Sequence, residues 1–177
     1  VGSVLPPLSA QDRLALTALA EDAARHDGWW RKRLDRMSPA VISGESSGEM
    51  RRIELMPGAS PERVALAAAL LARLAAQPAF DLALVPADLP RDALVNGWQP
   101  LGIRTEPGMT LSALTAQIGE MRADAAKHGY FLTDLLHRAP ELRDAAMPDL
   151  AINLRDFSAV PGAALTIALT DEGAALL

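Results

Sequence analysis

The sequence predicts an α/β fold, a two-layer sandwich in which helices pack mainly on one face of a mixed β-sheet of about four to six strands. Two observations support this prediction. Segments with helical spacing of apolar residues alternate with short strand-like runs along the 177-residue chain. Half of the residues are hydrophobic but only 4% are aromatic. The core must therefore be built largely from Ala, Leu and Val, which suits helices packed closely against a sheet.

Two segments carry the clearest helix signals. Residues 61–77 follow Ser60 as an N-cap and start with Pro61 at the first helical position. Their side chains are nearly all Ala and Leu, so we expect this helix to be buried on several sides. Thr110 is a second N-cap, for a helix that runs through residue 127. Its apolar residues alternate at spacings of three and four: Leu111, Leu114, Ile118, Met121 and Ala125.

Short apolar or alternating runs between turn residues predict the strands. They cover residues 50–55, 80–85, 101–105, 150–154 and 164–170, with Leu176 at the start of one further candidate. A short helix is expected over residues 131–138. A Pro-Gly turn separates the last two predicted strands.

The sequence pattern also predicts how the chain is divided. Residues 1–8 read as an extended lead-in or as residues added to the natural chain, and residues 9–177 as a single subdomain. Within it we expect N-terminal helices over 9–37, a flexible Ser- and Gly-rich loop over 38–48 and an α/β core over 49–177. A helix capped by Ser9 is expected to end near Arg25, where His26, Asp27 and Gly28 interrupt it before a second helical piece.

Composition excludes several classes of function. The net charge is -5 and the pI about 5.2, so no overall field attracts nucleic acid or an anionic membrane. No apolar run approaches the length of about 20 residues that a membrane span requires. The absence of cysteine excludes disulfides, thiolate catalysis and zinc–sulfur sites and fits a cytoplasmic location. We therefore expect neither a nucleic-acid nor a membrane partner.

No sequence motif points to a reaction centre. The histidines are His26, His128 and His137, and none has a partner at a metal-ligand spacing. There is no glycine-rich phosphate loop and no G-x-S-x-G nucleophile motif. His26 and Asp27 read as part of a helix break rather than as a catalytic dyad. The sequence thus predicts no catalytic residue, no cofactor and no metal site.

One basic cluster is a candidate interface. It consists of Trp29, Trp30, Arg31, Lys32 and Arg36. One interpretation is a docking patch for a phosphate or an acidic partner. The other is a solvated helix face whose aliphatic side-chain stems cover the tryptophans.

Four stretches of the chain carry a family resemblance. They are Gly28 to Leu34 (G-W-W-R-K-R-L), Val64 to Val85, Val95 to Arg104 (V-N-G-W-Q-P-L-G-I-R) and His128 to Arg143. In order and spacing they resemble the segments Y-W-R-x-x-L, L-L-A-R-L-x-G-Q with its following strand, F-V-N-T-L-P-L-R and H-Q-x-x-P-F-x-x-L-L of nonribosomal peptide synthetase condensation domains. The resemblance covers residues 29–170. It implies the C-terminal half of such a domain, with one lobe of the chloramphenicol-acetyltransferase-like fold.

The departures from that family imply a degenerate or truncated domain. The family's active-site motif, H-H-x-x-x-D-G, belongs to the N-terminal lobe, which the resemblance does not cover. His26, Asp27 and Gly28 form an H-D-G sequence without the paired histidines. Residues 85–88 (V-P-A-D) stand where the family has V-G-T-P-V. Acyl transfer between carrier-protein thioesters therefore has no visible mechanism, and we expect no enzymatic activity.

These observations leave three hypotheses open. The first is a non-catalytic platform that docks an adenylation domain, and as a second candidate a peptidyl carrier domain, of a synthetase for antibiotic biosynthesis. The second is the C-terminal lobe of an active condensation domain whose H-H-x-x-x-D-G lobe lies on another segment. The third is an unrelated α/β binding module.

Overall fold

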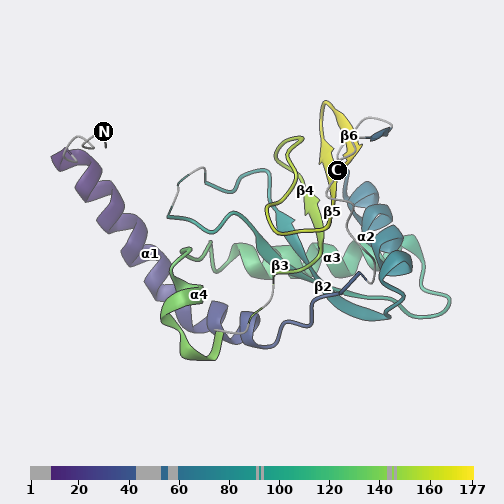
Figure 1. Cartoon of the computed structure of the whole chain (residues 1–177), viewed down its shortest axis with the longest axis horizontal. Coiled ribbons are helices and arrows are strands. Elements are labelled where there is room, and N and C mark those ends of the chain that lie inside the picture. Colours follow the sequence, from purple (N-terminus) through teal and green to yellow (C-terminus); the bar gives the residue numbers. More distant parts are fainter. Residues whose placement is uncertain are drawn as a thin grey trace.

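The computed structural model describes residues 9–42, 53–55, 60–90, 92, 94–142, 145 and 147–177. A six-stranded sheet with the order β1-β6-β5-β4-β2-β3 runs through the molecule (Figure 1). Its strands are β1 (Ile53–Leu55), β2 (Ala79–Val85), β3 (Gln99–Arg104), β4 (Leu150–Asn153), β5 (Leu165–Thr170) and β6 (Gly173–Leu176). The neighbours β2, β4 and β5 are parallel and the other pairs antiparallel. The predicted α/β fold with a mixed sheet is confirmed.

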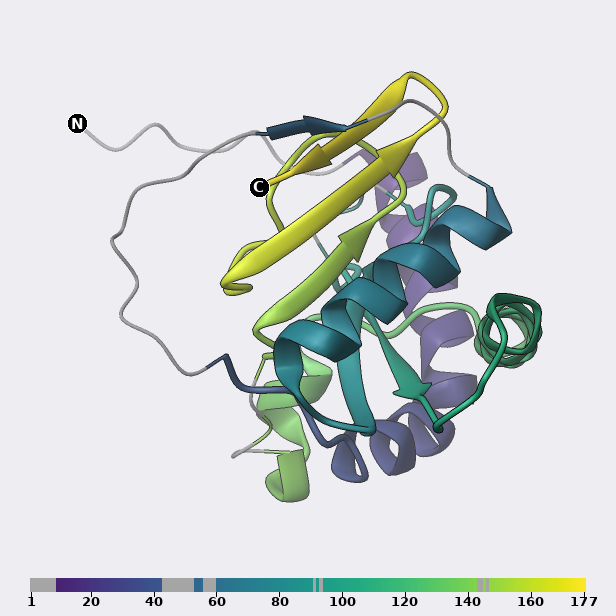
Figure 2. The same cartoon turned by 90° about the vertical axis from the view of Figure 1, so that its right-hand side faces the viewer.

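Helices α2 (Pro61–Ala75) and α3 (Leu111–Ala126) cover one face of this sheet (Figure 2). As predicted, the side chains of Ser60 and Thr110 cap them, accepting from the backbone N–H groups three residues later. Val64 and Leu71 of α2 and Leu114 and Ile118 of α3 are buried in the core below. The expectation that α2 is buried on several sides is wrong. Three of its leucines, Leu66, Leu70 and Leu74, are about half exposed.

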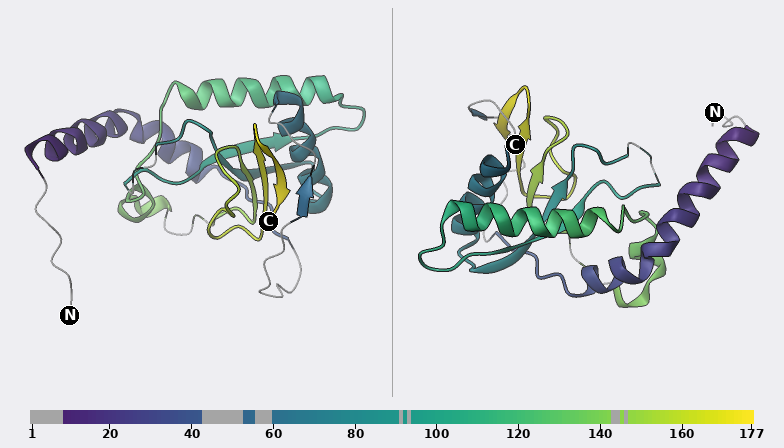
Figure 3. Two further views of the ribbon diagram at one scale, coloured as in Figure 1. Left: turned by 90° about the horizontal axis from the view of Figure 1, so that it is seen from above. Right: turned by 180° about the vertical axis from the view of Figure 1, so that it is seen from behind.

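Helix α1 (Ala10–Asp35) is one continuous helix, so the predicted break at residues 26–28 is wrong. Gly28 lowers helix propensity by only about 1 kcal/mol relative to Ala, and contacts of the neighbouring residues with the rest of the chain outweigh that cost. The N-terminal half of α1 projects from the body of the molecule (Figures 1 and 3). Its Leu14 is 73% exposed.

The C-terminal half of α1 packs on the second face of the sheet, together with α4 (Leu135–Arg138) and the 3-10 helix η1 (Pro140–Leu142). The buried residues of this layer include Trp30, Leu34, Phe131 and Leu135. Their sheet partners, Ala83 and Val85 on β2 and Ala151 on β4, are small or medium-sized. The sheet is thus covered on both faces, by α2 and α3 on one and by the C-terminal half of α1 with α4 and η1 on the other.

The helix expected over residues 131–138 forms only in its last four residues. The backbone before it pairs with the segment that precedes β3: the Asn96 N–H donates to Phe131 O over 2.9 Å, and the Thr133 N–H donates to Leu94 O over 2.9 Å. The first of these bonds uses the Phe131 carbonyl, which would be an acceptor in the first turn of a helix over residues 131–138.

Parts of the predicted organisation lie outside the described residues. They are the lead-in 1–8, residues 43–48 of the expected loop and residues 50–52 of the first predicted strand. The described start of that loop is tied to the sheet, because Pro39 forms a bridge with Asp81 of β2. None of the helices that the structure describes has the length and hydropathy of a membrane span.

Candidate functional site

Trp30 lies at the centre of the predicted interface but is buried inside this chain. It is 0% exposed, its ring packs against Phe131 with a centroid distance of 5.1 Å, and its indole N–H donates to His128 O over 2.9 Å. A helical residue that faces the sheet cannot contact a partner domain. Trp30 is therefore a core residue and drops out of the candidate interface.

The basic residues of the candidate interface divide into two kinds. Arg31 forms an ion pair with Glu141 of η1. A backbone hydrogen bond lowers the pKa of Glu141, and the bond from Arg31 lowers it further. Lys32 and Arg36, by contrast, are exposed and form no ion pair with any described residue. Trp29 is partly buried. All three cations are exposed, but only Lys32 and Arg36, beside the open part of Trp29, have no ion-pair partner among the described residues.

Two further ion pairs hold this end of α1 in place. Arg33 pairs with Asp81, which is 7% exposed on β2 and also accepts from the Ser38 N–H over 2.7 Å. Arg138 of α4 pairs with Asp27, and this hydrogen bond raises the pKa of Arg138. Only Oδ2 of Asp27 takes part in this pair, and its buried Oδ1 has no hydrogen-bond partner among the described residues.

The structure brings together two histidines that are 102 residues apart in the sequence. Nδ1 of His26 lies 3.3 Å from Nδ1 of His128, and Trp29 stacks on His128 with a centroid distance of 4.3 Å and an interplanar angle of 19°. Helical spacing alone gives no signal for this pair, because His128 follows α3 and reaches α1 only through the tertiary fold. The third histidine, His137, is exposed on α4.

A cavity of about 560 Å³ lies between α3, the first turn of α2 and the end of the sheet where β2 leaves and β3 enters. Its walls are mainly apolar, with Val64, Leu84 and Ile118 among the lining residues. Gln99 and Arg122 also line it, and Gln99 Nε2 donates to Gly129 O over 2.9 Å. The volume lies in the range of small-molecule pockets. No histidine is among its lining residues, and its ionisable groups are Asp88, Arg122 and Tyr130.

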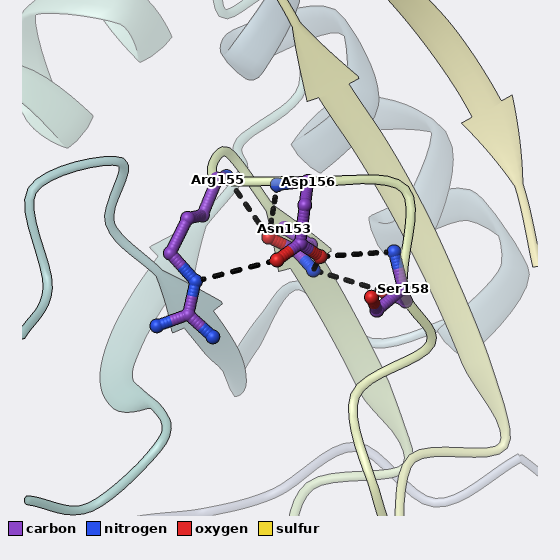
Figure 4. A network of polar contacts seen from close by, with 4 residues as sticks. All are labelled: Asn153, Arg155, Asp156 and Ser158. Atoms are coloured by element: carbon purple, nitrogen blue, oxygen red, sulfur yellow. Dashed lines mark hydrogen bonds and ion pairs between the residues drawn. The ribbon is translucent and has the colours of Figure 1, made fainter. Parts of the chain in front are cut away.

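A polar network closes the turn after β4 (Figure 4). Asn153 is 3% exposed; its amide donates to Asp156 Oδ1 over 3.0 Å and to Ser158 O over 2.9 Å, and its oxygen accepts from the Arg155 N–H over 2.9 Å. Each of these bonds stays within five residues along the chain. The network therefore shapes a turn, and no group in it is arranged as a nucleophile with a base.

Among the described residues, no group of three or more His, Cys, Asp or Glu side chains converges as a metal site. The pair of histidines and the cavity are the two features that the sequence did not indicate. Both are assembled from segments that are distant in the sequence.

Comparisons with known proteins give the fold. No family model matches the sequence, and no curated protein matches it. Among solved structures, the chain is similar to the first condensation domain of the calcium-dependent antibiotic synthetase in complex with a substrate analogue. The TM-score is 0.64 and the identity 18%, over 98% of this chain and 52% of that one.

Two structures of the starter condensation domain of rhizomide synthetase are also similar. The first has a TM-score of 0.59 at 19% identity, covering 92% of this chain and 46% of that one. The second, a variant with C8-CoA bound, has a TM-score of 0.62 at 16% identity, covering 92% and 47%. The chain therefore spans about half the length of these condensation domains. It has the fold of one half of a nonribosomal peptide synthetase condensation domain.

Proposed function

We propose that this chain is a non-catalytic, truncated condensation-like subdomain of a nonribosomal peptide synthetase, located in the cytoplasm, that serves as a docking platform for a neighbouring adenylation domain. A peptidyl carrier domain is the second candidate partner. One observation carries the proposal: the fold matches half of a condensation domain, while no two histidines of the sequence are adjacent as in the H-H-x-x-x-D-G motif.

The proposed docking surface is the end of α1. Lys32 and Arg36 lie four residues apart, and so on one face of the helix, and both are exposed. The helix below them is held by buried Trp30 and by the ion pair between Arg33 and Asp81. A rigid helix that presents two cations without an ion pair to any residue the structure describes suits an acidic partner surface, because charges placed on a fixed element need little ordering on binding.

The test is the affinity of the chain for the adenylation domain of its synthetase, measured by calorimetry. The charge reversal Lys32→Glu with Arg36→Glu should weaken binding about tenfold, as expected for two rim charges of about 0.5–1 kcal/mol each. Arg31 is left unchanged because it pairs with Glu141.

Arg73→Glu is the matched control, because Arg73 is exposed at the far end of α2. It should bind as wild type does. Equal affinities for wild type, the double reversal and this control would refute docking at the end of α1.

A second candidate function is the C-terminal lobe of an active condensation domain whose catalytic histidines lie on another segment. The observation that favours it is the projecting N-terminal half of α1 with its exposed Leu14, a surface that suits a contact with a second lobe. Co-expression with a segment carrying H-H-x-x-x-D-G should then restore acyl transfer. A stable complex that still lacks activity would favour the platform instead.

A further inference from the structure

We propose that His26 and His128 form a two-histidine binding site for a divalent transition-metal ion such as Zn²⁺, Ni²⁺ or Cu²⁺. Neither the sequence nor the likeness to condensation domains points to such a site. The inference is independent of the proposed docking function, since it rests on the spacing, rigidity and exposure of two imidazoles.

The separation of the two nitrogens fits a shared ion. Zn–N bonds of about 2.0–2.1 Å at a tetrahedral angle place two ligand nitrogens about 3.3–3.4 Å apart. The Nδ1 atoms of His26 and His128 are 3.3 Å apart. With one ring protonated on Nδ1, the same separation allows an N–H···N hydrogen bond, and a bound ion would take the place of that proton. The rings are steeply inclined to each other, with an interplanar angle of 73°, so they do not stack.

Both rings are held before any ion binds. His26 lies within continuous α1. His128 lies in the turn after α3, where its N–H donates to Ala125 O over 2.9 Å and its own carbonyl accepts from the Trp30 indole. Trp29 stacks on the ring of His128. Such support lowers the ordering cost of binding, as outer contacts of metal ligands generally do.

Three carboxylates lie on the neighbouring segments. Asp22 pairs with Arg25, Oδ2 of Asp27 with Arg138, and Asp124 with Lys127, while Oδ1 of Asp27 is buried without a hydrogen-bond partner among the described residues. No third protein ligand converges on the two rings among the described residues. Both histidines are partly exposed, so water can complete the coordination. Imidazole ligands suit Zn²⁺, Ni²⁺ and Cu²⁺, with Cu²⁺ the tightest. A bound ion would tie α1 to the turn after α3.

The experiment is a titration of the whole chain with Cu²⁺, followed by tryptophan fluorescence, with Zn²⁺ followed by thermal unfolding. Cu²⁺ should quench Trp29 in a saturable one-to-one manner that a chelator reverses, and Zn²⁺ should raise the melting temperature. His26→Ala or His128→Ala should each weaken binding at least about tenfold, since each removes half of the protein ligands. His137→Ala, at an exposed histidine on α4, is the control and should bind as wild type.

The variant His128→Ala keeps the backbone carbonyl that accepts from Trp30, and His26→Asn with His128→Asn provides a second pair if alanine at either position disturbs folding. Circular dichroism verifies that each variant is folded. The inference is overturned if wild type shows no saturable binding. It is equally overturned if the double variant binds as tightly as wild type, because the ion is then held elsewhere.

Discussion

At the scale of single residues, Asp81 is the side chain that joins the first helix to the sheet. It is buried on a central strand, accepts from the Ser38 N–H and pairs with Arg33. Gly102 on the neighbouring strand leaves room for this pair: a Cβ there would lie 3.3 Å from Asp81 Oδ1 and 3.4 Å from an Arg33 nitrogen. The sequence places Asp81 in an alternating strand but gives no indication of its distant partner.

Asp81→Asn should destabilise the protein by about 2–3 kcal/mol, because it leaves the partly buried guanidinium of Arg33 without its counter-charge. Urea unfolding measures the change. The matched control is Asp124→Asn, which removes an exposed pair with Lys127 and should cost less than about 0.5 kcal/mol. Equal losses in the two variants would contradict the anchoring role of Asp81.

Asp156 gives a pH dependence with a definite sign. Hydrogen bonding from the side chain of Ser158 is the largest effect that lowers its pKa from the ordinary value of 3.8; the Ser158 N–H, the Asn153 amide and Arg155 add to it. The folded state therefore binds this proton less readily than the unfolded chain does. The stabilisation is complete above the unfolded pKa and is lost as the pH falls through the folded one.

The urea midpoint of wild type should fall from about pH 5 to about pH 2, and it should fall less in Asp156→Asn. Part of the fall should remain in the variant, because the pKa values of Asp12, Glu62 and Glu141 are lowered as well. A variant with the same pH profile as wild type would show that the turn after β4 gains nothing from the charge of Asp156.

At the scale of elements, the edge of the sheet at β3 is poorly suited to binding another strand, since most of its residues are buried. Pro100 has no N–H, so its pair with Ala83 must be a non-hydrogen-bonded one, in which the backbone N–H and C=O groups point away from the neighbouring strand. Because this orientation recurs at every second residue, the N–H groups of Gly102 and Arg104 also point away from β2. The Arg104 N–H is taken by Gln117 Oε1 over 3.1 Å. Few backbone N–H groups of β3 are therefore left to pair with another strand, as is common in natural edge strands. A partner domain is therefore expected to dock on helices rather than to extend the sheet.

Gly28→Ala should stabilise the protein by about 0.5–1 kcal/mol. Gly28 lies inside α1, and a Cβ at this position meets no atom within 4 Å, so alanine adds helix propensity without a clash. Gly129→Ala is the contrasting variant and should destabilise by about 1 kcal/mol, because Gly129 has φ +56°. Thermal unfolding of both measures the difference, and a loss of stability in Gly28→Ala would indicate that α1 is broken near residue 28 in solution.

The sequence predicts most elements of the core well, for physical reasons. Helix α2 and strand β2 have caps, prolines and periodic apolar residues within their own segments, and the structure places their ends within two residues of the predicted ones. The predictions fail where tertiary contacts, rather than the local sequence, determine the secondary structure. Helix α1 continues through Gly28 because Trp29 stacks on His128 and Trp30 packs against Phe131. Residues 131–134 pair with the segment before β3 instead of forming a helix.

At the scale of the whole molecule, the chain has the fold of one half of a condensation domain. Order and spacing of four motifs predicted the fold, which the solved condensation domains match over about half of their length. For the candidate interface, charge density indicates Trp29, Trp30, Arg31, Lys32 and Arg36, but the sequence does not tell which of them face the core. Trp30 is buried and Arg31 paired, whereas Lys32 and Arg36 are exposed and pair with no residue that the structure describes.

The most direct measurement of the central claim is a thioester-transfer assay with donor- and acceptor-loaded carrier proteins, read by mass spectrometry, with an intact condensation domain as the positive control. The folded chain alone should give no more peptide product than a reaction without it. Product that forms in its presence and disappears in His128→Ala would contradict the claim that this half-domain is non-catalytic.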